Sequence, residues 1–176
     1  MIKLIPLLES IPTNITNIYV DMDEVLSAFD LQFESLKSNS EKLSPLEWET
    51  KYGKDTLWDI IDPAGIEFWS EMKWFPGGKK LIQYLLPLKD KYDIQLLSTP
   101  SIEKDSRDGK ALWVKNNLHD VFKLNLSFTK ADYATPTSIL IDDFINNINK
   151  WRKAGGIAIQ HKNINDTLKQ LKELGI

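Results

Sequence analysis

Four acidic residues, in two close pairs, stand directly after short apolar runs of the sequence. Asp21 and Asp23 follow one run, and Asp142 and Asp143 follow another. Residues two apart on an extended chain point to the same side, and parallel strands bring their carboxyl ends to one edge of a sheet. Carboxylates gathered there would repel one another unless a cation were bound, and oxygen-only ligands favour Mg2+ over zinc or copper. The two pairs therefore predict a magnesium site.

Hydroxyl and ammonium groups follow two further apolar runs. Ser98 and Thr99 stand after one run, and Lys130 stands close after the other. Together with a metal and a carboxylate they suit phosphoryl transfer, because cations neutralise a phosphate that would otherwise repel the attacking carboxylate. Attack by Asp21 would give an aspartyl-phosphate that water then hydrolyses. Each piece alone has an ordinary explanation as a turn, a helix cap or a surface lysine. Their joint order is what indicates catalysis.

The spacing of apolar residues predicts the elements that would position these groups. Short β-branched or alternating runs predict strands at residues 18–20, 94–97, 124–128, 138–141 and 157–159. Apolar stripes at helical spacing predict helices at residues 79–88, 110–118, 144–154 and 164–174. Such alternation is typical of parallel βαβ units, so we predict an α/β fold with a doubly wound, Rossmann-like parallel sheet.

Residues 29–73 interrupt the alternation. They are rich in aromatic residues, are punctuated by Pro45 and Pro63, and show no strong strand pattern. The simplest interpretation is a small helical cap inserted after the first strand, so that the α/β core comprises residues 1–28 and 74–176. Such a cap would lie over the carboxyl ends of the strands, where open α/β sheets bind ligands.

Composition excludes several other classes of protein. The 176 residues are 42% apolar and 27% charged, with a net charge of −3, which fits one globular unit and predicts no broad nucleic-acid-binding face. The absence of cysteine excludes disulfides and thiolate zinc sites. The apolar run within residues 1–9 is broken by Pro6, so we expect no signal peptide, and no run approaches the ~18 residues of a membrane span. We therefore expect a cytoplasmic protein that does not associate with membranes.

The ordered motifs resemble those of the haloacid dehalogenase superfamily. In this resemblance Asp21 attacks phosphorus, Asp23 acts as general acid/base, and Ser98, with Thr99 beside it, and Lys130 bind the phosphoryl group. Magnesium would be held by Asp21, by the backbone carbonyl of Asp23 and by Asp142. Asp143 would support the site from outside the set of direct ligands.

A narrower resemblance is to the 5′(3′)-deoxyribonucleotidases. It is carried by the runs Phe75-Pro76-Gly77-Gly78, Ser98-Thr99-Pro100, Gly109-Lys110 with Trp113, and Leu140-Ile141-Asp142-Asp143. In that family aromatic residues of the cap hold the nucleobase, which implies Phe29 first, with Phe68 and Trp69 behind it. Lys110 is an alternative phosphate-binding lysine, in place of Lys130 or beside it.

The sequence departs from the family pattern at two positions. Glu24 stands where the first motif usually has glycine, and Ala28 stands where an acidic residue is frequent.

The expected activity is a magnesium-dependent phosphatase acting on nucleoside monophosphates, with 5′(3′)-deoxyribonucleotides as the family's substrates. The alternatives are a phosphatase of the same superfamily acting on a sugar phosphate or another small phosphometabolite, and a non-catalytic binding or regulatory protein of this fold. The intact set of motif residues argues against the last. The oligomeric state is open, with a homodimer as one alternative.

Overall fold

The computed structural model describes residues 14–37 and 41–176. The apolar run within residues 1–9, for which no signal peptide is expected, lies outside the described residues. No helix in the described ranges combines the length and the apolar character needed to cross a membrane.

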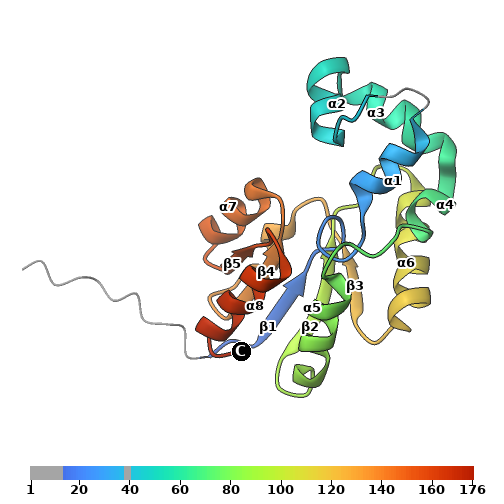
Figure 1. The fold of residues 1–176 in the computed structure, drawn as a ribbon. Coiled ribbons are helices and arrows are strands. Elements are labelled where there is room, and N and C mark those ends of the chain that lie inside the picture. Colours follow the sequence, from blue (N-terminus) through green and yellow to red (C-terminus); the bar gives the residue numbers. More distant parts are fainter. Residues whose placement is uncertain (1–13, 38–40) are drawn as a thin grey trace, which may run out of the picture.

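Five strands form one parallel sheet, as the sequence predicted (Figure 1). They are β1 (Asn17–Val20), β2 (Asp93–Ser98), β3 (Lys123–Leu126), β4 (Ser138–Asp142) and β5 (Ile157–Gln160), in the order β3-β2-β1-β4-β5. The chain runs outward from β1 to β3 on one side and then crosses over to β4 and β5 on the other. The direction of winding therefore changes between β1 and β4, and such a switch point is where doubly wound sheets bind ligands.

Helices cover both faces of the sheet. From residue 78 onward they are α5 (Gly78–Leu85), α6 (Lys104–Leu118), α7 (Ile145–Lys153) and α8 (Ile164–Glu173), with 3-10 turns η2 (Leu86–Leu88) and η3 (Lys130–Tyr133). Alternate residues of β1 face opposite layers: Ile18 lies in the larger buried cluster with Leu81 and Leu171, whereas Tyr19 packs with Trp151 of α7. This burial on both faces explains why the strands read as continuous apolar runs.

Three predicted boundaries were wrong by more than one residue. α5 ends at Leu85 rather than at residue 88, because the chain continues as the 3-10 turn η2, which contains Pro87. β3 ends at Leu126 rather than continuing to 128, because the Ser127 N–H donates to the Ser98 carbonyl and the chain then turns away, leaving Phe128 59% exposed. α6 begins at Lys104, six residues before the predicted start at Lys110. Its first turns are polar and carry no apolar stripe, so periodicity could not reveal them.

Between β1 and α5 the described residues form short helices and no strand of the sheet. The helices are α1 (Phe29–Leu36), α2 (Pro45–Tyr52), α3 (Lys54–Ile61) and α4 (Gly65–Ser70), with a 3-10 turn η1 (Asp62–Ala64). Ser44 and Glu47 form a capping box at the start of α2, and Pro45 occupies its first turn. Figure 1 shows α1–α3 above the carboxyl ends of the strands and α4 beside α6.

α4 packs against α6 at backbone distance. A Cβ atom at Gly109 of α6 would lie 2.5 Å from the Cβ of Trp69 and 2.7 Å from the carbonyl oxygen of Ile66. Only glycine permits this approach, which explains the residue before Lys110. The contact brings Trp69 to the carboxyl edge of the sheet.

Candidate active site

Asp21 stands at the carboxyl end of β1 and is 5% exposed. Its N–H donates to the Ile141 carbonyl oxygen at 2.9 Å, which extends the pairing of β1 with β4 by one residue. One carboxylate oxygen, Oδ1, accepts from the Met22 N–H at 2.7 Å and lies 2.7 Å from Lys130 Nζ. Burial raises the pKa of Asp21 and Lys130 opposes that rise, while Asp142 adds to it. The side chain is thus held in one orientation at the switch point.

Lys130 bridges two carboxylates. Its Nζ lies 2.7 Å from Asp21 Oδ1 and 2.6 Å from Asp142 Oδ2, and the side chain is buried at the start of η3. Burial acts to lower the pKa of this lysine, but Asp21 and Asp142 more than offset burial, so its pKa is raised. The ammonium therefore stays charged over the physiological pH range.

Asp142, the last residue of β4, is fully buried, and both of its carboxylate oxygens accept hydrogen bonds. Its Oδ1 accepts from the Phe144 N–H at 2.9 Å, and Asn147 Nδ2 lies 3.2 and 3.1 Å from its two oxygens. These donors come from the beginning of α7. Helix and strand together fix the orientation of the carboxylate.

Asp143 is the carboxylate with the least compensation. Burial, followed by repulsion from Asp21 and Asp142, raises its pKa to about 8. Within the described part of the chain, no lysine or arginine nitrogen lies within 4.0 Å of it. Oxygens of Asp21, Asp142 and Asp143 all lie within 4.8 Å of one another, so the three carboxylates could hold a metal ion. The resemblance placed Asp143 outside the direct ligands, whereas the structure brings its oxygen into this cluster.

Lys110 connects Asp23 to Ser98. Its Nζ lies 2.5 Å from Asp23 Oδ2 and 3.1 Å from Ser98 Oγ, and the side chain is fully buried beneath the Trp69 ring, 5.0 Å from its centroid. The sequence left open whether Lys110 or Lys130 serves the site. The structure places both there, one on each side of Asp21.

The charges of this group do not balance. When fully ionised, four carboxylates, those of Asp21, Asp23, Asp142 and Asp143, share two ammonium groups. The excess equals the charge of one divalent cation, and oxygen donors are the ligands that a hard cation prefers.

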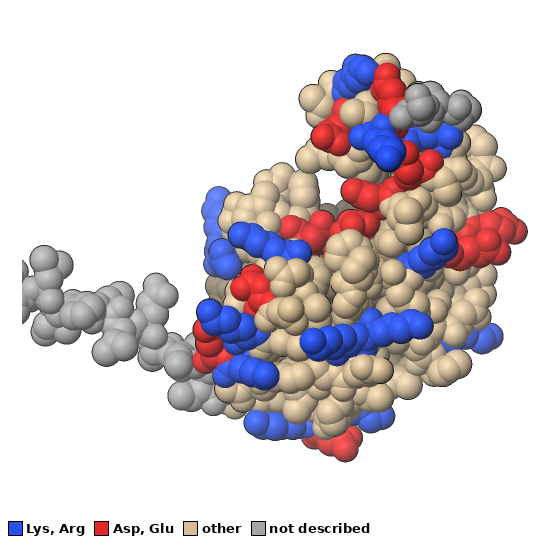
Figure 2. Space-filling view, in the orientation of Figure 1, with Lys and Arg blue, Asp and Glu red and all other residues tan. Residues whose placement is uncertain are grey.

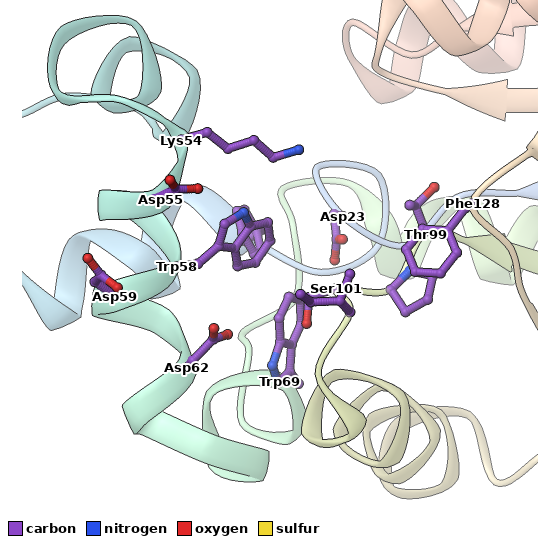
Figure 3. A pocket seen from close by; sticks show the side chains of 13 residues that line it. Asp23, Lys54, Asp55, Trp58, Asp59, Asp62, Trp69, Thr99, Ser101 and Phe128 are labelled. Atoms are coloured by element: carbon purple, nitrogen blue, oxygen red, sulfur yellow. The ribbon is translucent and has the colours of Figure 1, made fainter.

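A cavity of about 660 Å³ opens between Asp23 and the helices above it. On the face shown in Figure 2, acidic side chains border a hollow between the upper helices and the rest of the molecule. Figure 3 shows Asp23, Thr99 and Ser101 on one side and the residues of α3 on the other. Of the aromatic residues expected to hold a ligand, Phe29 and Trp69 line the cavity. Phe68 does not: it is buried behind them, with its ring centroid 5.5 Å from that of Phe29 and 4.9 Å from that of Trp69.

α3 and η1 provide a part of the cavity lining that was not predicted from the sequence. It consists of Lys54, Asp55, Trp58, Asp59 and Asp62. Asp55, Trp58, Asp59 and Asp62 stand at intervals of three, one and three residues, which is the spacing of one helical face. A polar stripe with a tryptophan at its centre was therefore visible in the sequence.

Glu24 occupies a left-handed backbone position beside Asp23, with φ at +54°. That conformation favours glycine, which explains why the first motif usually has glycine at this position. Its Oε1 accepts from the Asp30 N–H at 2.9 Å, a free donor in the first turn of α1, where Ala28 offers no side-chain cap. Burial, with repulsion from Asp30 and Asp23, raises the pKa of Glu24 to about 7. Glu24 thus connects the loop after β1 to the first turn of α1.

No family model matches the sequence, and no curated protein matches it. Solved structures do match in fold. A haloacid dehalogenase-family enzyme from Bacteroides thetaiotaomicron, in complex with magnesium and inorganic phosphate, is 16% identical with a TM-score of 0.51, over 85% of this chain and 95% of that chain. A haloacid dehalogenase-like hydrolase from Xanthomonas campestris is 8% identical with a TM-score of 0.57, over 91% of both chains. The chain therefore has the Rossmann-like fold of the haloacid dehalogenase-type hydrolases.

Proposed function

We propose that the protein is a magnesium-dependent phosphatase in which Asp21 is the nucleophile. The observation that carries the proposal is the placement of the Asp21 carboxylate. Lys130 and the Met22 N–H hold one of its oxygens at the end of β1, next to Asp142 and Asp143. A carboxylate fixed at a ligand-binding edge, among more negative charge than the protein compensates, is suited to attack a phosphate that arrives with a cation.

The residues present fit magnesium. Asp21, Asp142 and Asp143 offer oxygens only, and the Asp23 backbone carbonyl is a further candidate ligand. When bound, Mg2+ would supply positive charge that stabilises the phosphoryl oxygens during transfer. The fold neighbour from Bacteroides thetaiotaomicron, which was crystallised with magnesium and inorganic phosphate, supports this assignment.

The side chains divide the proton and charge transfers between them. Asp21 forms a bond to phosphorus while the bond from phosphorus to the leaving oxygen breaks, and Asp23 donates a proton to that oxygen. Asp23 then takes a proton from the water that hydrolyses the aspartyl-phosphate. Lys110 now pairs with Asp23 and Ser98. Binding of an incoming phosphate by Lys110, Ser98 and Thr99 would release Asp23 to carry its proton.

A nucleoside monophosphate is the substrate that we favour, including the 5′(3′)-deoxyribonucleotides. The cavity of about 660 Å³ lies within the range of about 300–1,000 Å³ that is usual for small-ligand sites, and Phe29, Trp58 and Trp69 offer flat apolar surfaces. A sugar phosphate is the second candidate, because exposed carboxylates in the same lining can accept hydrogen bonds from hydroxyl groups.

A phosphate-release screen with magnesium over nucleoside monophosphates and sugar phosphates tests the proposal. Asp21→Asn should lower activity by at least about a thousandfold, because an amide does not attack phosphorus as a carboxylate does. Asp90→Asn, in the exposed turn before β2, is the matched control and should retain normal activity. Release by Asp21→Asn at the wild-type rate, or no release from any substrate by the wild type, would refute the proposed function.

A further inference from the structure

The lining of the cavity above Asp23 is of two chemical kinds. Phe29 and Trp69 form the aromatic wall. The acidic wall comes from α3 and the turn that follows it, with Trp58 among its carboxylates. In Figure 3, Trp58 and Asp62 extend from this helical side toward Asp23 and Ser101 across the cavity. A molecule bound at Asp21 through its phosphate would therefore extend between a π surface and a group of carboxylates.

The acidic wall carries more negative charge than its neighbours neutralise. Asp55, Asp59 and Asp62 line the cavity with a single ammonium group, that of Lys54. Over residues 14–37 and 41–176, no lysine or arginine nitrogen lies within 4.0 Å of these three carboxylates. Partial desolvation, with repulsion from Glu103, Asp59 and Asp105, raises the pKa of Asp62, although its side chain is exposed.

Other helices do place lysines beside carboxylates: Lys104 pairs with Asp108 in α6, and Lys169 lies 3.8 Å from Glu173 in α8. In α3 the positions four residues after Asp55 and Asp59 are Asp59 and Pro63, so neither carboxylate has a lysine on the following turn.

We infer that the substrate's leaving group presents hydrogen-bond donors or a positively charged nitrogen to Asp55, Asp59 and Asp62 while an apolar face lies against the aromatic wall. Carboxylates accept charge-assisted hydrogen bonds, and aromatic faces attract cations. A second phosphate or a carboxylate in the leaving group would be repelled. Among nucleotides, bases with exocyclic amino groups are favoured over those that present carbonyl oxygens at the same position. The inference rests on the proposed phosphatase function and names its substrate class.

Two matched pairs of substrates test the inference by the ratio of kcat/KM within each pair. Deoxycytidine and deoxyuridine 5′-monophosphates differ by an amino group against a carbonyl oxygen. Phosphoethanolamine and phosphoglycolate are similar in size and differ by an ammonium against a carboxylate. Wild-type protein should favour the nitrogen-bearing member by about threefold in the first pair, and by about tenfold (~1.4 kcal/mol) in the second. The pair with the higher kcat/KM distinguishes a nucleotide from a small amino alcohol as the source of the donor.

The double variant Asp59→Asn/Asp62→Asn should bring both ratios close to one. Both side chains are exposed, so the fold should tolerate the change. Asp90→Asn, distant from the cavity, should leave the ratios as in the wild type. p-Nitrophenyl phosphate, whose leaving group has no donor, monitors the chemistry alone, and Asp90→Asn should hydrolyse it at the wild-type rate.

The outcomes separate the inference from the function on which it rests. If the wild type hydrolyses none of the five substrates, the proposed function fails. Hydrolysis of p-nitrophenyl phosphate with ratios near one in the wild type would overturn the inference alone. So would ratios that persist unchanged in the double variant.

Discussion

Replacing Lys130 by methionine tests the charge balance of the site without relying on activity. Methionine keeps much of the length and apolar volume of lysine but lacks its charge. The change would leave Asp21 and Asp142, now 2.7 and 2.6 Å from Lys130 Nζ, without their shared cation. Removing one partner of a buried ion pair costs about 3–5 kcal/mol, because a buried charge is left uncompensated. We expect a loss of that size at pH 8 in EDTA.

The expected loss depends on pH and on magnesium. The pKa of Asp21 is already raised by burial, and Lys130 is the main group that opposes the rise. Without Lys130 the folded protein should take up a proton at higher pH, so the loss should shrink at pH 5, where protonation neutralises a carboxylate. Mg2+ should also reduce the loss, because the variant has one more uncompensated carboxylate and should bind the cation more tightly than the wild type; at saturation, a tenfold lower Kd would recover about 1.4 kcal/mol.

Urea unfolding followed by circular dichroism measures these free energies, at pH 5 and pH 8, with EDTA and with Mg2+. Lys89→Met is the control, because Lys89 is exposed near the opposite end of the strands. The control should change the free energy of unfolding by no more than about 0.5 kcal/mol. A loss below about 1 kcal/mol for Lys130→Met, or a loss that is equal at both pH values and indifferent to Mg2+, would refute the reasoning.

Two further predictions concern packing and pH. Gly109→Ala should lower the free energy of unfolding by about 1–3 kcal/mol, because the added methyl group would lie 2.5 Å from Trp69 Cβ. Urea unfolding measures this change. An unchanged unfolding midpoint would contradict the close contact between α4 and α6. The metal-free protein should lose stability as pH rises from about 4 to about 8, because the pKa of Asp143 is raised to about 8 and the folded state holds a proton that the unfolded state releases. Urea unfolding in EDTA between pH 4 and pH 8 should show this decline, and saturating Mg2+ should abolish it. A stability that rises with pH in EDTA would refute the raised pKa of Asp143.

The sheet and the groups at its edge were predictable because they depend on local patterns. Each strand buried on both faces reads as an apolar run, and the residue after such a run is placed by the topology. Asp21 and Asp142 are of this kind. The start of α6 was not predictable from periodicity. Its first turns are polar, and they are fixed by a hydrogen bond in which the Ser106 hydroxyl accepts from the Ser101 N–H.

The lining of the cavity depends on contacts distant in sequence. Phe68 and Trp69 are adjacent aromatic residues, yet only Trp69 lines the cavity. Which of them does so is decided by the packing of α4 on α6, and no local pattern encodes that packing. The acidic face of α3 was encoded in its spacing, but its significance appears only once the helix is placed opposite Asp23.

The glycine contact between α4 and α6 limits how the protein can admit and release ligands. A lid that swings as one body needs both of its connections to the core to act as hinges, but here the returning connection is fixed by backbone packing at Gly109. Trp69 therefore belongs mechanically to the core although it comes from the inserted segment. The two tryptophans of the cavity lining thus differ in their support: Trp69 is anchored by the close backbone contact of α4 with α6, whereas Trp58 comes from α3, which precedes that contact in the chain.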